Sequence, residues 1–249
     1  MIQIEDLHKA FDDKEILKGI SFTFERGKTN LIIGASGSGK SVLIKCIVGL
    51  FPINKGKIFY DGRAFTNLNF KEKKAIRSEI GMLFQGGALF DSYTVRENVK
   101  FPLQMHSKMT NKEMEKRVDF CLERVELAHA GDKYPSEISG GMQKRVGIAR
   151  AIALNPKYLF CDEPNSGLDP QTSIVIDNLI REITVEYNIT TIVVTHDMNS
   201  VMEIGDNILF LYQGKAVWTG NSKNILHSDN DILNNFVYAS KIMKKFKGS

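Results

Sequence analysis

The chain has 249 residues, 43% hydrophobic and 25% charged, which is ordinary for a globular protein and enough for one large α/β domain. Its net charge of +4 resides at the C-terminus, because removing four lysines there from the 33 basic residues leaves 29, against 29 acidic residues. Such a balanced chain lacks the basic footprint of a nucleic-acid-binding protein. The basic C-terminal end carries Lys241, Lys244, Lys245 and Lys247. We expect this end to contact anionic lipid or a partner, or to be simply solvated.

No segment approaches the roughly 18 consecutive apolar residues of a membrane-spanning helix. The stretch Met1–Phe11 alternates in polarity instead of joining a basic segment to an apolar one, so it is not a signal peptide. We therefore expect the chain to stay in the cytoplasm. The three cysteines are widely spaced and form no CxxC pair, which predicts buried thiols in a reducing compartment; they are Cys46, Cys121 and Cys161.

The N-terminal quarter of the chain predicts strands followed by one helix. Residues Ile2 to Phe24 alternate between apolar and polar, which indicates antiparallel strands. The apolar run Thr29–Ile33 predicts a buried strand that leads directly into a glycine-rich turn, after which Ser41–Leu50 has helical spacing. A further strand, Lys57–Tyr60, precedes the turn Asp61-Gly62.

Helical spacing of the hydrophobic residues dominates the middle of the chain, after a strand at Ile80–Phe84. The predicted helices there are Val95–Met105, Met114–Val125 and Gly141–Ala153. Strands and helices then alternate again, as Tyr158–Cys161, helix Thr172–Tyr187, Thr190–Thr195, Ile208–Leu211 and an edge strand at Ala216–Trp218. The pattern predicts a parallel α/β core with a helical subdomain inserted at about residues 90–155, a domain of residues 1–220 and a helical tail of residues 221–249.

A glycine-rich segment follows the predicted strand Thr29–Ile33 and opens the helix after it. The segment matches GxxxxGK followed by Ser or Thr, and reads Gly34, Ala35, Ser36, Gly37, Ser38, Gly39, Lys40, Ser41. Glycines let successive N–H groups turn inward around phosphates at a helix N-terminus. Lys40 would then reach the β- and γ-phosphates, and the Ser41 hydroxyl would ligate Mg²⁺. A structural loop is the alternative, but spacing and context favour an ATP site.

The strand Tyr158–Cys161 ends in two acids, Asp162 and Glu163. Adjacent carboxylates at a buried strand end are costly unless a cation or water compensates them. Asp162 is predicted to hold Mg²⁺ and Glu163 to act as general base toward the attacking water. A surface acid pair is the alternative, which the phosphate-binding loop makes less favourable.

A second anion-binding helix start is predicted at Ser139-Gly140-Gly141. Ser139 has the character of an N-cap, and the two glycines allow a close approach to a ligand. Because one nucleotide hardly needs two helix N-termini from one chain, we predict a head-to-tail homodimer. In it, the loop Gly34–Ser41 of one chain and Ser139–Gly141 of the other would enclose each ATP.

With these motifs in this order, the chain resembles the ATP-binding subunits of ABC transporters from about Ile2 to Gly220. The resemblance implies an ABC-type P-loop ATPase core, with a RecA-like parallel sheet, an N-terminal antiparallel β subdomain and the helical insert. It also implies integral-membrane permease partners. By position, the resemblance implies that Phe11 stacks on adenine beside Ile16 and that Gln85 contacts Mg²⁺ and the lytic water. It implies that Ser166–Asp169 communicates across the dimer, with Asp169 at the nucleotide, and that His196 contacts the γ-phosphate.

Two departures from the common family pattern, Met142 and Asn165, indicate a subfamily. The sequences FQGGALFDS, at 84–92, and SGGMQKR, at 139–145, resemble the ATPases of Mla/Mce-type lipid transport systems, which are MlaF-like. That resemblance implies an MlaE-like permease, an Mce-domain lipid-binding protein and phospholipid movement between two membranes, with the ATPase peripheral on the inner one. The alternative is drift within a generic importer or exporter ATPase.

Other classes of protein share part of this pattern. A P-loop kinase or GTPase needs neither Ser139–Gly141 nor His196. A DNA-repair or chromosome-organising ATPase shares every motif but usually carries a long coiled coil or a basic face. A regulatory ATPase for a division partner stays open. The tail, predicted as a helix over Asp231–Phe246, packs on a dimer partner, which we favour, or on its own domain; its apolar side is Leu233, Phe236, Val237 and Ile242.

Overall fold

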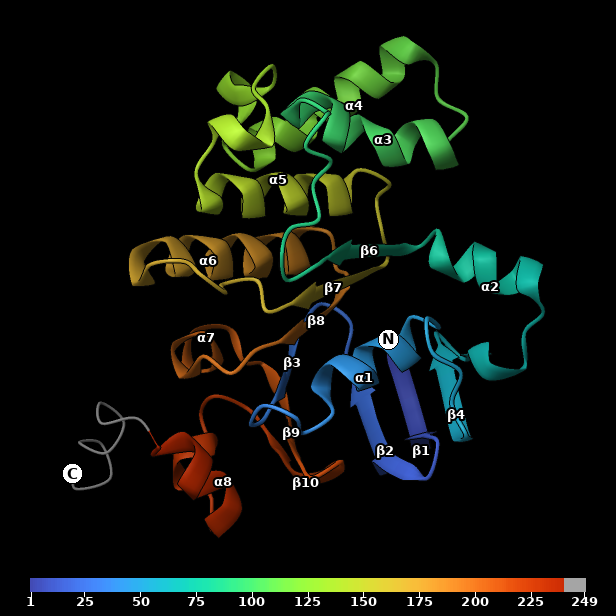
Figure 1. Cartoon of the computed structure of the whole chain (residues 1–249), viewed down its shortest axis with the longest axis vertical. Helices are drawn as coiled ribbons and strands as arrows, with labels where there is room; N and C mark the ends of the chain where they lie inside the picture. The colour runs from blue at the N-terminus through green and yellow to red at the C-terminus, as the bar shows by residue number, and fades with distance from the viewer. Residues whose placement is uncertain (240–249) are drawn as a thin grey trace.

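Two β-sheets organise the computed structural model, which describes residues 1–239 (Figure 1). The first sheet is antiparallel, in the order β2-β1-β4-β5, and is built from β1 (Ile2–Phe11), β2 (Lys14–Phe24), β4 (Lys55–Tyr60) and β5 (Arg63–Ala64). The second sheet has the order β10-β9-β3-β8-β7-β6. Its strands are β3 (Thr29–Ile33), β6 (Ile80–Leu83), β7 (Tyr158–Asp162), β8 (Thr190–Val194), β9 (Asn207–Tyr212) and β10 (Lys215–Gly220).

The second sheet is parallel except at one edge, where β10 pairs antiparallel with β9. Every residue of β3 and of β8 is buried, as expected for parallel strands covered on both faces. The predicted edge strand Ala216–Trp218 lies within β10 and is confirmed.

Eight α-helices surround the sheets in the part of the chain that the structure describes. They are α1 (Lys40–Ile47), α2 (Phe70–Arg77), α3 (Val95–His106), α4 (Asn111–Arg124), α5 (Gly140–Ile152), α6 (Pro170–Glu186), α7 (Met198–Ile204) and α8 (Asp231–Val237). Short 3-10 turns occupy Phe65–Asn67, Ala128–Ala130, Pro135–Glu137 and Ile225–His227. Helices α3, α4 and α5 lie at the top of Figure 1, and α1 lies with the antiparallel sheet below. None of these helices is long and apolar enough to cross a membrane.

Capping explains where several helices begin. Thr94 and Thr110 each accept a hydrogen bond from the backbone N–H three residues on, and a glutamate reaches back to each cap, so α3 and α4 both start with a capping box. The same arrangement at Asn69 starts α2, which hydrophobic spacing does not predict because Ile76 is its one buried residue. The prediction also omitted α7, a seven-residue helix capped by Asp197.

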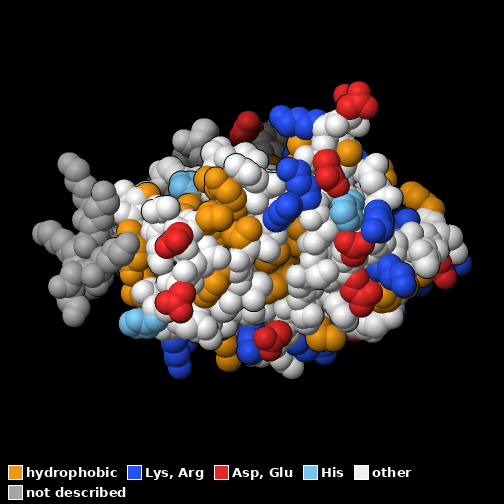
Figure 2. All heavy atoms as spheres, turned by 90° about the horizontal axis from the view of Figure 1, so that it is seen from below, with side chains coloured by type: hydrophobic (Ala, Val, Ile, Leu, Met, Phe, Trp, Pro, Cys, Tyr) orange, Lys and Arg blue, Asp and Glu red, His pale blue; other side chains and the backbone are white. Residues whose placement is uncertain are grey.

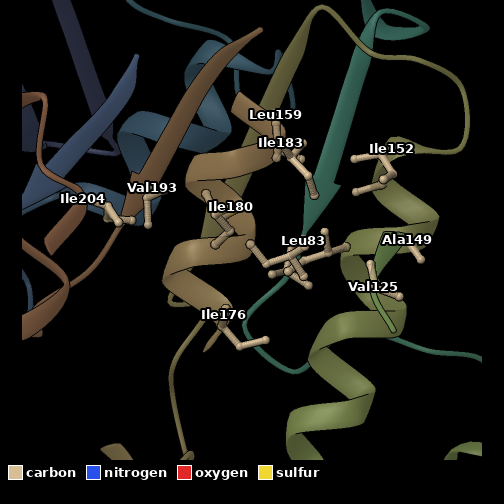
Figure 3. Close-up of a cluster of buried hydrophobic side chains, with 14 of the residues drawn as sticks. Leu83, Val125, Ala149, Ile152, Leu159, Ile176, Ile180, Ile183, Val193 and Ile204 are labelled. Atoms are coloured by element: carbon tan, nitrogen blue, oxygen red, sulfur yellow. The ribbon is translucent and has the colours of Figure 1, made fainter. Parts of the chain in front are cut away.

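The six-stranded sheet has an apolar core on each face, since successive strand residues point to opposite sides. Along β7, Leu159 and Cys161 join the core toward α5 and α6, whereas Tyr158 and Phe160 join the core toward α1 and the antiparallel sheet. Figure 3 shows the first core, where Ile176, Ile180 and Ile183 of α6 lie beside Leu83 and the α5 side chains.

The C-terminal segment packs on its own domain. Leu233 and Val237 are fully buried in the core toward α5 and α6, and the Phe236 ring lies 5.2 Å from that of Phe210. The expected contact of these three residues with a dimer partner is therefore wrong, because intrachain packing already buries this side of α8. Ile242 and the predicted helix beyond residue 239 lie outside the described residues.

The outer surface mixes charges of both signs. In the view of Figure 2, acidic and basic side chains lie next to one another, with hydrophobic side chains between them. Ion pairs on the antiparallel sheet have this character, as Lys55 Nζ lies 2.8 Å from Asp6 and His8 lies between Asp6 and Glu15. The predicted burial of the three cysteines is confirmed, and burial raises the pKa of the Cys46 thiol to about 11.

We expect Ile180→Ala to lower the free energy of unfolding by about 2–5 kcal/mol, because it leaves a cavity in a packed core. Urea denaturation followed by circular dichroism measures the loss. The matched control is Val185→Ala on the same helix, whose side chain is 62% exposed and whose truncation should cost no more than about 0.5 kcal/mol. Equal effects of the two substitutions would contradict the core assignment.

Candidate active site

The loop between β3 and α1 curls because three of its glycines have left-handed backbone angles. Gly34, Gly37 and Gly39 have φ of 148°, 76° and 106°. A Cβ on Gly34 would overlap the carbonyl oxygen of Leu211, and one on Gly39 would lie 2.8 Å from the Leu17 side chain. Only glycine therefore fits at these two positions, and β2 lies directly against the loop.

Lys40 turns its ammonium back into this loop. Its Nζ donates to the carbonyl oxygens of Gly34 at 2.8 Å and Ala35 at 3.1 Å. Burial lowers the pKa of Lys40, and the charges of Glu163 and Asp162 oppose that shift. The acid pair thus lies close enough to the loop to act on its lysine. Ser41, one residue into α1, is exposed.

The acid pair and His196 lie where adjacent parallel strands end. Asp162 pairs in register with Val194, so Glu163 follows one residue after the paired position and His196 follows two residues after it. The Glu163 carboxylate lies 2.9 Å from His196 Nδ1, and its backbone N–H donates to the Val194 carbonyl. Glu163 has φ of 50°, a left-handed conformation that is strained for a residue with a side chain and is typical of functional sites.

One oxygen of the Asp162 carboxylate lacks a hydrogen-bond partner, whereas the Glu163 carboxylate contacts His196. This oxygen, Oδ1 of Asp162, is buried. Burial raises the pKa of this carboxyl, as does the charge of Glu163, while Lys45 and Lys40 oppose the shift. A buried carboxylate oxygen with no partner, beside a loop suited to phosphates, is the kind of oxygen donor that Mg²⁺ takes.

Gln85 and Phe11 lie at the borders of this region. Gln85 is exposed two residues after β6, whose Leu83 pairs with Cys161 of β7, so it emerges at the same edge as the acid pair. Phe11 ends β1 and is partly exposed, with its ring 5.2 Å from that of Phe51 in an edge-to-face contact. Ile16, on the paired strand β2, packs against the core below the loop.

The structure does not bring Ser139 to the phosphate-binding loop of the same chain. Ser139 caps α5 by accepting from the Met142 N–H at 3.3 Å, and a Cβ on Gly141 would lie 2.5 Å from the Thr172 side chain. Residues at the starts of α5 and α6 together line a cleft of about 380 Å³ there. In Figure 1, α5 and α1 lie in different layers, with the six-stranded sheet and α6 between them.

Asp169 belongs to this second group. Its Oδ1 accepts from the backbone N–H groups of Gln171 and Thr172, each at 3.0 Å, so its carboxylate caps α6. Its hydrogen bonds with Thr172 lower the pKa of the carboxyl. The predicted residues therefore fall into two groups, one around the loop and the acid pair and one at the starts of α5 and α6.

The sequence of residues 17–166 matches the ABC transporter family. The chain belongs to this family. It is 37% identical over 244 residues to the probable ribonucleotide transport ATP-binding protein mkl of Mycobacterium tuberculosis, a match that spans 97% of this chain and 67% of that protein. It is 42% identical over 223 residues to the methionine import ATP-binding protein MetN of Carboxydothermus hydrogenoformans, which covers 88% of this chain and 66% of that one.

Solved structures of the same family have the same fold. The structure of cbiO1 from Clostridium perfringens, part of the ABC transporter complex cbiONQ, has a TM-score of 0.86 and 31% identity, and the match spans 99% of this chain and 98% of cbiO1. The dimeric ATP-binding cassette MJ0796, in a post-hydrolysis state with ADP and Pi, has a TM-score of 0.80 and 32% identity over 89% of this chain and 99% of that one.

The predicted ABC ATPase fold and the predicted ATPase activity are therefore confirmed. The chain is the ATP-binding subunit of an ABC transporter. The kinase and GTPase alternatives are excluded, because neither class belongs to this family.

Asn165, one of the two departures in this ABC ATPase, joins three elements. Its Nδ2 donates at 2.9 Å to Asp177 Oδ1 on α6 and at 2.9 Å to Ser200 Oγ on α7. The loop after Glu163 is thereby tied to the helix that follows His196. Met142, the other departure, packs against the core toward α5 and α6 and has no polar role.

Two basic residues of α5, absent from the predicted site, contact the loop that begins at Gln85. Lys144 donates to the Gln85 carbonyl, and Arg150 donates to the Gly87 and Ala88 carbonyls at 2.7 Å each. The signal in the sequence is weak: Lys144 falls on the buried side of α5 with Ile148 and Ala151, where the helical period requires hydrophobic residues.

Asp177 makes the stability of this ABC ATPase depend on pH. Burial raises the pKa of its carboxyl from 3.8 to about 6, so the native state holds the proton more tightly than the unfolded state. The resulting stabilisation is full below pH 4 and is lost as pH rises through 6, a change of about 3 kcal/mol. We expect wild type to lose most of that amount relative to Asp177→Asn between pH 4 and 7.5. Urea unfolding at both pH values measures it, and parallel pH profiles would contradict it.

Proposed function

We propose that the loop Gly34–Ser41 binds the phosphates of MgATP and that Glu163 and His196 act on the attacking water. The proximity of the loop and the acid pair supports this assignment, since Asp162 and Glu163 both influence the Lys40 charge. On binding ATP, the Lys40 ammonium would exchange its bonds to the Gly34 and Ala35 carbonyls for the β- and γ-phosphate oxygens. Inward-facing N–H groups of residues 34–41 would hold the remaining phosphate oxygens.

The residues present fit a magnesium ion. Asp162 Oδ1 is buried without a partner, and the Ser41 hydroxyl and the Gln85 amide are the other oxygen donors that we propose for it. When bound with ATP, Mg²⁺ neutralises charge on the β- and γ-phosphate oxygens. The protein contributes the fixed position of Asp162, set by its register with Val194.

Glu163 is placed to orient the water and accept its proton. Its backbone hydrogen bond to Val194 and its contact with His196 fix the carboxylate from two sides. His196 would contact the γ-phosphate and hold Glu163 in place. Catalysis of phosphoryl transfer rests on such positioning and on charge stabilisation.

We propose that a second chain completes each site in a head-to-tail homodimer. Within one chain, Ser139, Gly140 and Gly141 lie away from the loop Gly34–Ser41, so they are available to the γ-phosphate bound by a partner. Asp169 at the start of α6 would lie near the same junction, and Phe11 would stack on adenine. The dimeric form of the related cassette with ADP and Pi supports this arrangement.

Glu163→Gln should reduce ATP turnover by a factor of about 100 or more while ATP binding persists, because the amide accepts no proton. The variant should accumulate as an ATP-bound dimer, which size-exclusion chromatography with light scattering measures. Lys40→Ala is the control, since it should lose both turnover and the ATP-dependent dimer. An ATP-loaded Glu163→Gln variant that stays monomeric would refute the two-chain site, and near-normal turnover of Lys40→Ala would refute the loop assignment.

An aromatic surface beside Gln85 supports docking of a permease. We define it by the partly exposed rings of Phe84, Phe90 and Tyr93. The Phe90 ring lies 5.3 Å from Tyr93 and 4.8 Å from Phe101, so these side chains form one cluster. Exposed aromatic clusters on a folded protein mark interaction sites.

The loop under this aromatic surface is held firmly. The buried Asn98 side chain donates to the carbonyls of Phe90 and Tyr93 and accepts from the Phe90 N–H at 2.8 Å. Arg150 binds the Gly87 and Ala88 carbonyls from below. A pre-formed surface loses little conformational entropy when a cytoplasmic helix of the permease docks on it.

We propose that the cargo is phospholipid, moved between two membranes with an MlaE-like permease and an Mce-domain protein. The chain would then be a peripheral protein on the cytoplasmic side of the inner membrane. The sequences FQGGALFDS and SGGMQKR support this cargo. The chain is also 38% identical over 256 aligned residues to the protein TRIGALACTOSYLDIACYLGLYCEROL 3 of Arabidopsis thaliana, whose name contains that of a lipid. That match spans 96% of this chain and 74% of the relative. The ribonucleotide and methionine proteins among the relatives favour the alternative, a small polar cargo.

Phe90→Asp should abolish co-purification of a polytopic membrane protein with the tagged chain from detergent-solubilised native membranes, because it puts a charge in an apolar interface. Phe120→Asp on α4 is the matched control, since Phe90 and Phe120 are both 41% exposed. Mass spectrometry identifies the partner. Recovery of no polytopic partner with the unsubstituted chain would refute the docking proposal.

The cargo is tested with the co-purified complex in vesicles. ATP should drive transfer of a fluorescent phospholipid by the wild-type complex but not by one that carries Glu163→Gln. Absence of ATP-dependent transfer in a complex that hydrolyses ATP would refute the phospholipid cargo while leaving the ATPase site intact.

A further inference from the structure

Lys144 is a buried cation in the middle of α5, with only 6% of its surface exposed. A lysine is rarely buried to this degree unless its ammonium is paired. Its position on α5 lies five residues after Ser139, on the side of the helix that faces the six-stranded sheet and otherwise carries residues such as Ile148. Hydrophobic packing therefore does not account for the residue.

The ammonium of Lys144 lies where three segments meet. It donates to the backbone carbonyl of Gln85 and lies 3.4 Å from the hydroxyl of Ser166. The Ser166 hydroxyl in turn lies 3.4 Å from the same Gln85 carbonyl. One charged group thus joins α5, the segment after β6 and the loop after Glu163.

The charge of Lys144 also acts on the acid pair. Burial lowers the pKa of its ammonium, and the charges of Glu163 and Asp162 oppose that shift. The same Coulomb interaction opposes the rise in the pKa of Asp162 that burial causes.

Helix α5 packs closely against β6. A Cβ on Gly147 would lie 2.5 Å from the Leu83 side chain, and one on Gly81 would overlap the Ala151 carbonyl. Arg150, six residues beyond Lys144, binds the Gly87 and Ala88 carbonyls, so two cations of one helix hold the segment Gln85–Ala88.

We infer that Lys144 is a positioning residue for ATP hydrolysis, which fixes the Gln85 backbone against the helix that begins at Ser139. It places the Gln85 side chain at the water and metal side of the acid pair, and it couples the position of Ser139 to the aromatic surface through one rigid element. The inference rests on the proposed roles of Gln85 and Ser139.

The test compares Lys144→Met with Lys144→Arg, and Lys112→Met on the exposed start of α4 is the control. We expect Lys144→Met to lower kcat about tenfold with little change in KM for ATP, because a charge-assisted hydrogen bond to Gln85 is lost while the loop Gly34–Ser41 is untouched. Lys144→Arg should restore most of kcat, since it keeps a donor. Lys112→Met should behave as wild type.

A second readout does not depend on turnover. Amide hydrogen exchange of residues 85–88, measured by mass spectrometry without nucleotide, should accelerate in Lys144→Met and return toward wild type in Lys144→Arg. Ser166→Ala should accelerate it less, since it leaves the ammonium in place, and this variant supplies the comparison if Lys144→Met does not fold.

Unchanged kcat and exchange in Lys144→Met would overturn the inference. So would a loss of kcat that Lys144→Arg does not rescue and that a matching fall in Tm accompanies, because that result means a purely structural lysine. In either case Lys40→Ala and Glu163→Gln still report on the proposed ATP site, so the two failures are distinguishable.

Discussion

Parallel hydrogen bonding of β3, β8, β7 and β6 is the constraint on which the site depends. The register sets Ile32 and Asp162 against the same residue, Val194, from opposite sides, so the three strands end at one edge of the sheet. The turn after β3 and the carboxylates after β7 are more than 120 residues apart in the chain. They meet because all parallel strands present their carboxyl ends on one side.

Helix α5 extends from Ser139 to the loop that carries the aromatic surface. The helix is capped by Ser139, which we propose contacts a second chain, and its side chains hold the loop that carries the aromatic surface. Glycines at its contact with β6 let the two backbones approach closely. Because closely packed interiors transmit strain, we expect a displacement of one end of α5 to reach the other end. If the proposed roles of Ser139 and the aromatic surface hold, α5 would connect the nucleotide to the membrane partner directly.

Buried charges are concentrated around the site and compensate one another only in part. Lys40 and Lys144 approach the acid pair from different elements, and Asp162 keeps an oxygen without a partner. Burying such groups costs stability. In the proposed function, a bound cation and phosphate chain would compensate the charges that remain. Asp177 is a further buried acid, satisfied by Asn165 through a bond that also fixes the loop after Glu163.

The sequence by itself determined the features that depend on neighbours in the chain. Consecutive residues form the loop Gly34–Ser41, local alternation and helical spacing reveal the strands and the longer helices, and the cap at Ser139 is local. The tertiary structure alone decided that α8 packs on its own domain, that Ser139 lies away from the loop, and that Lys144 meets Gln85. Those contacts join residues that lie far apart in the chain. They are determined by the packing of the whole fold, which leaves no periodic pattern in the sequence.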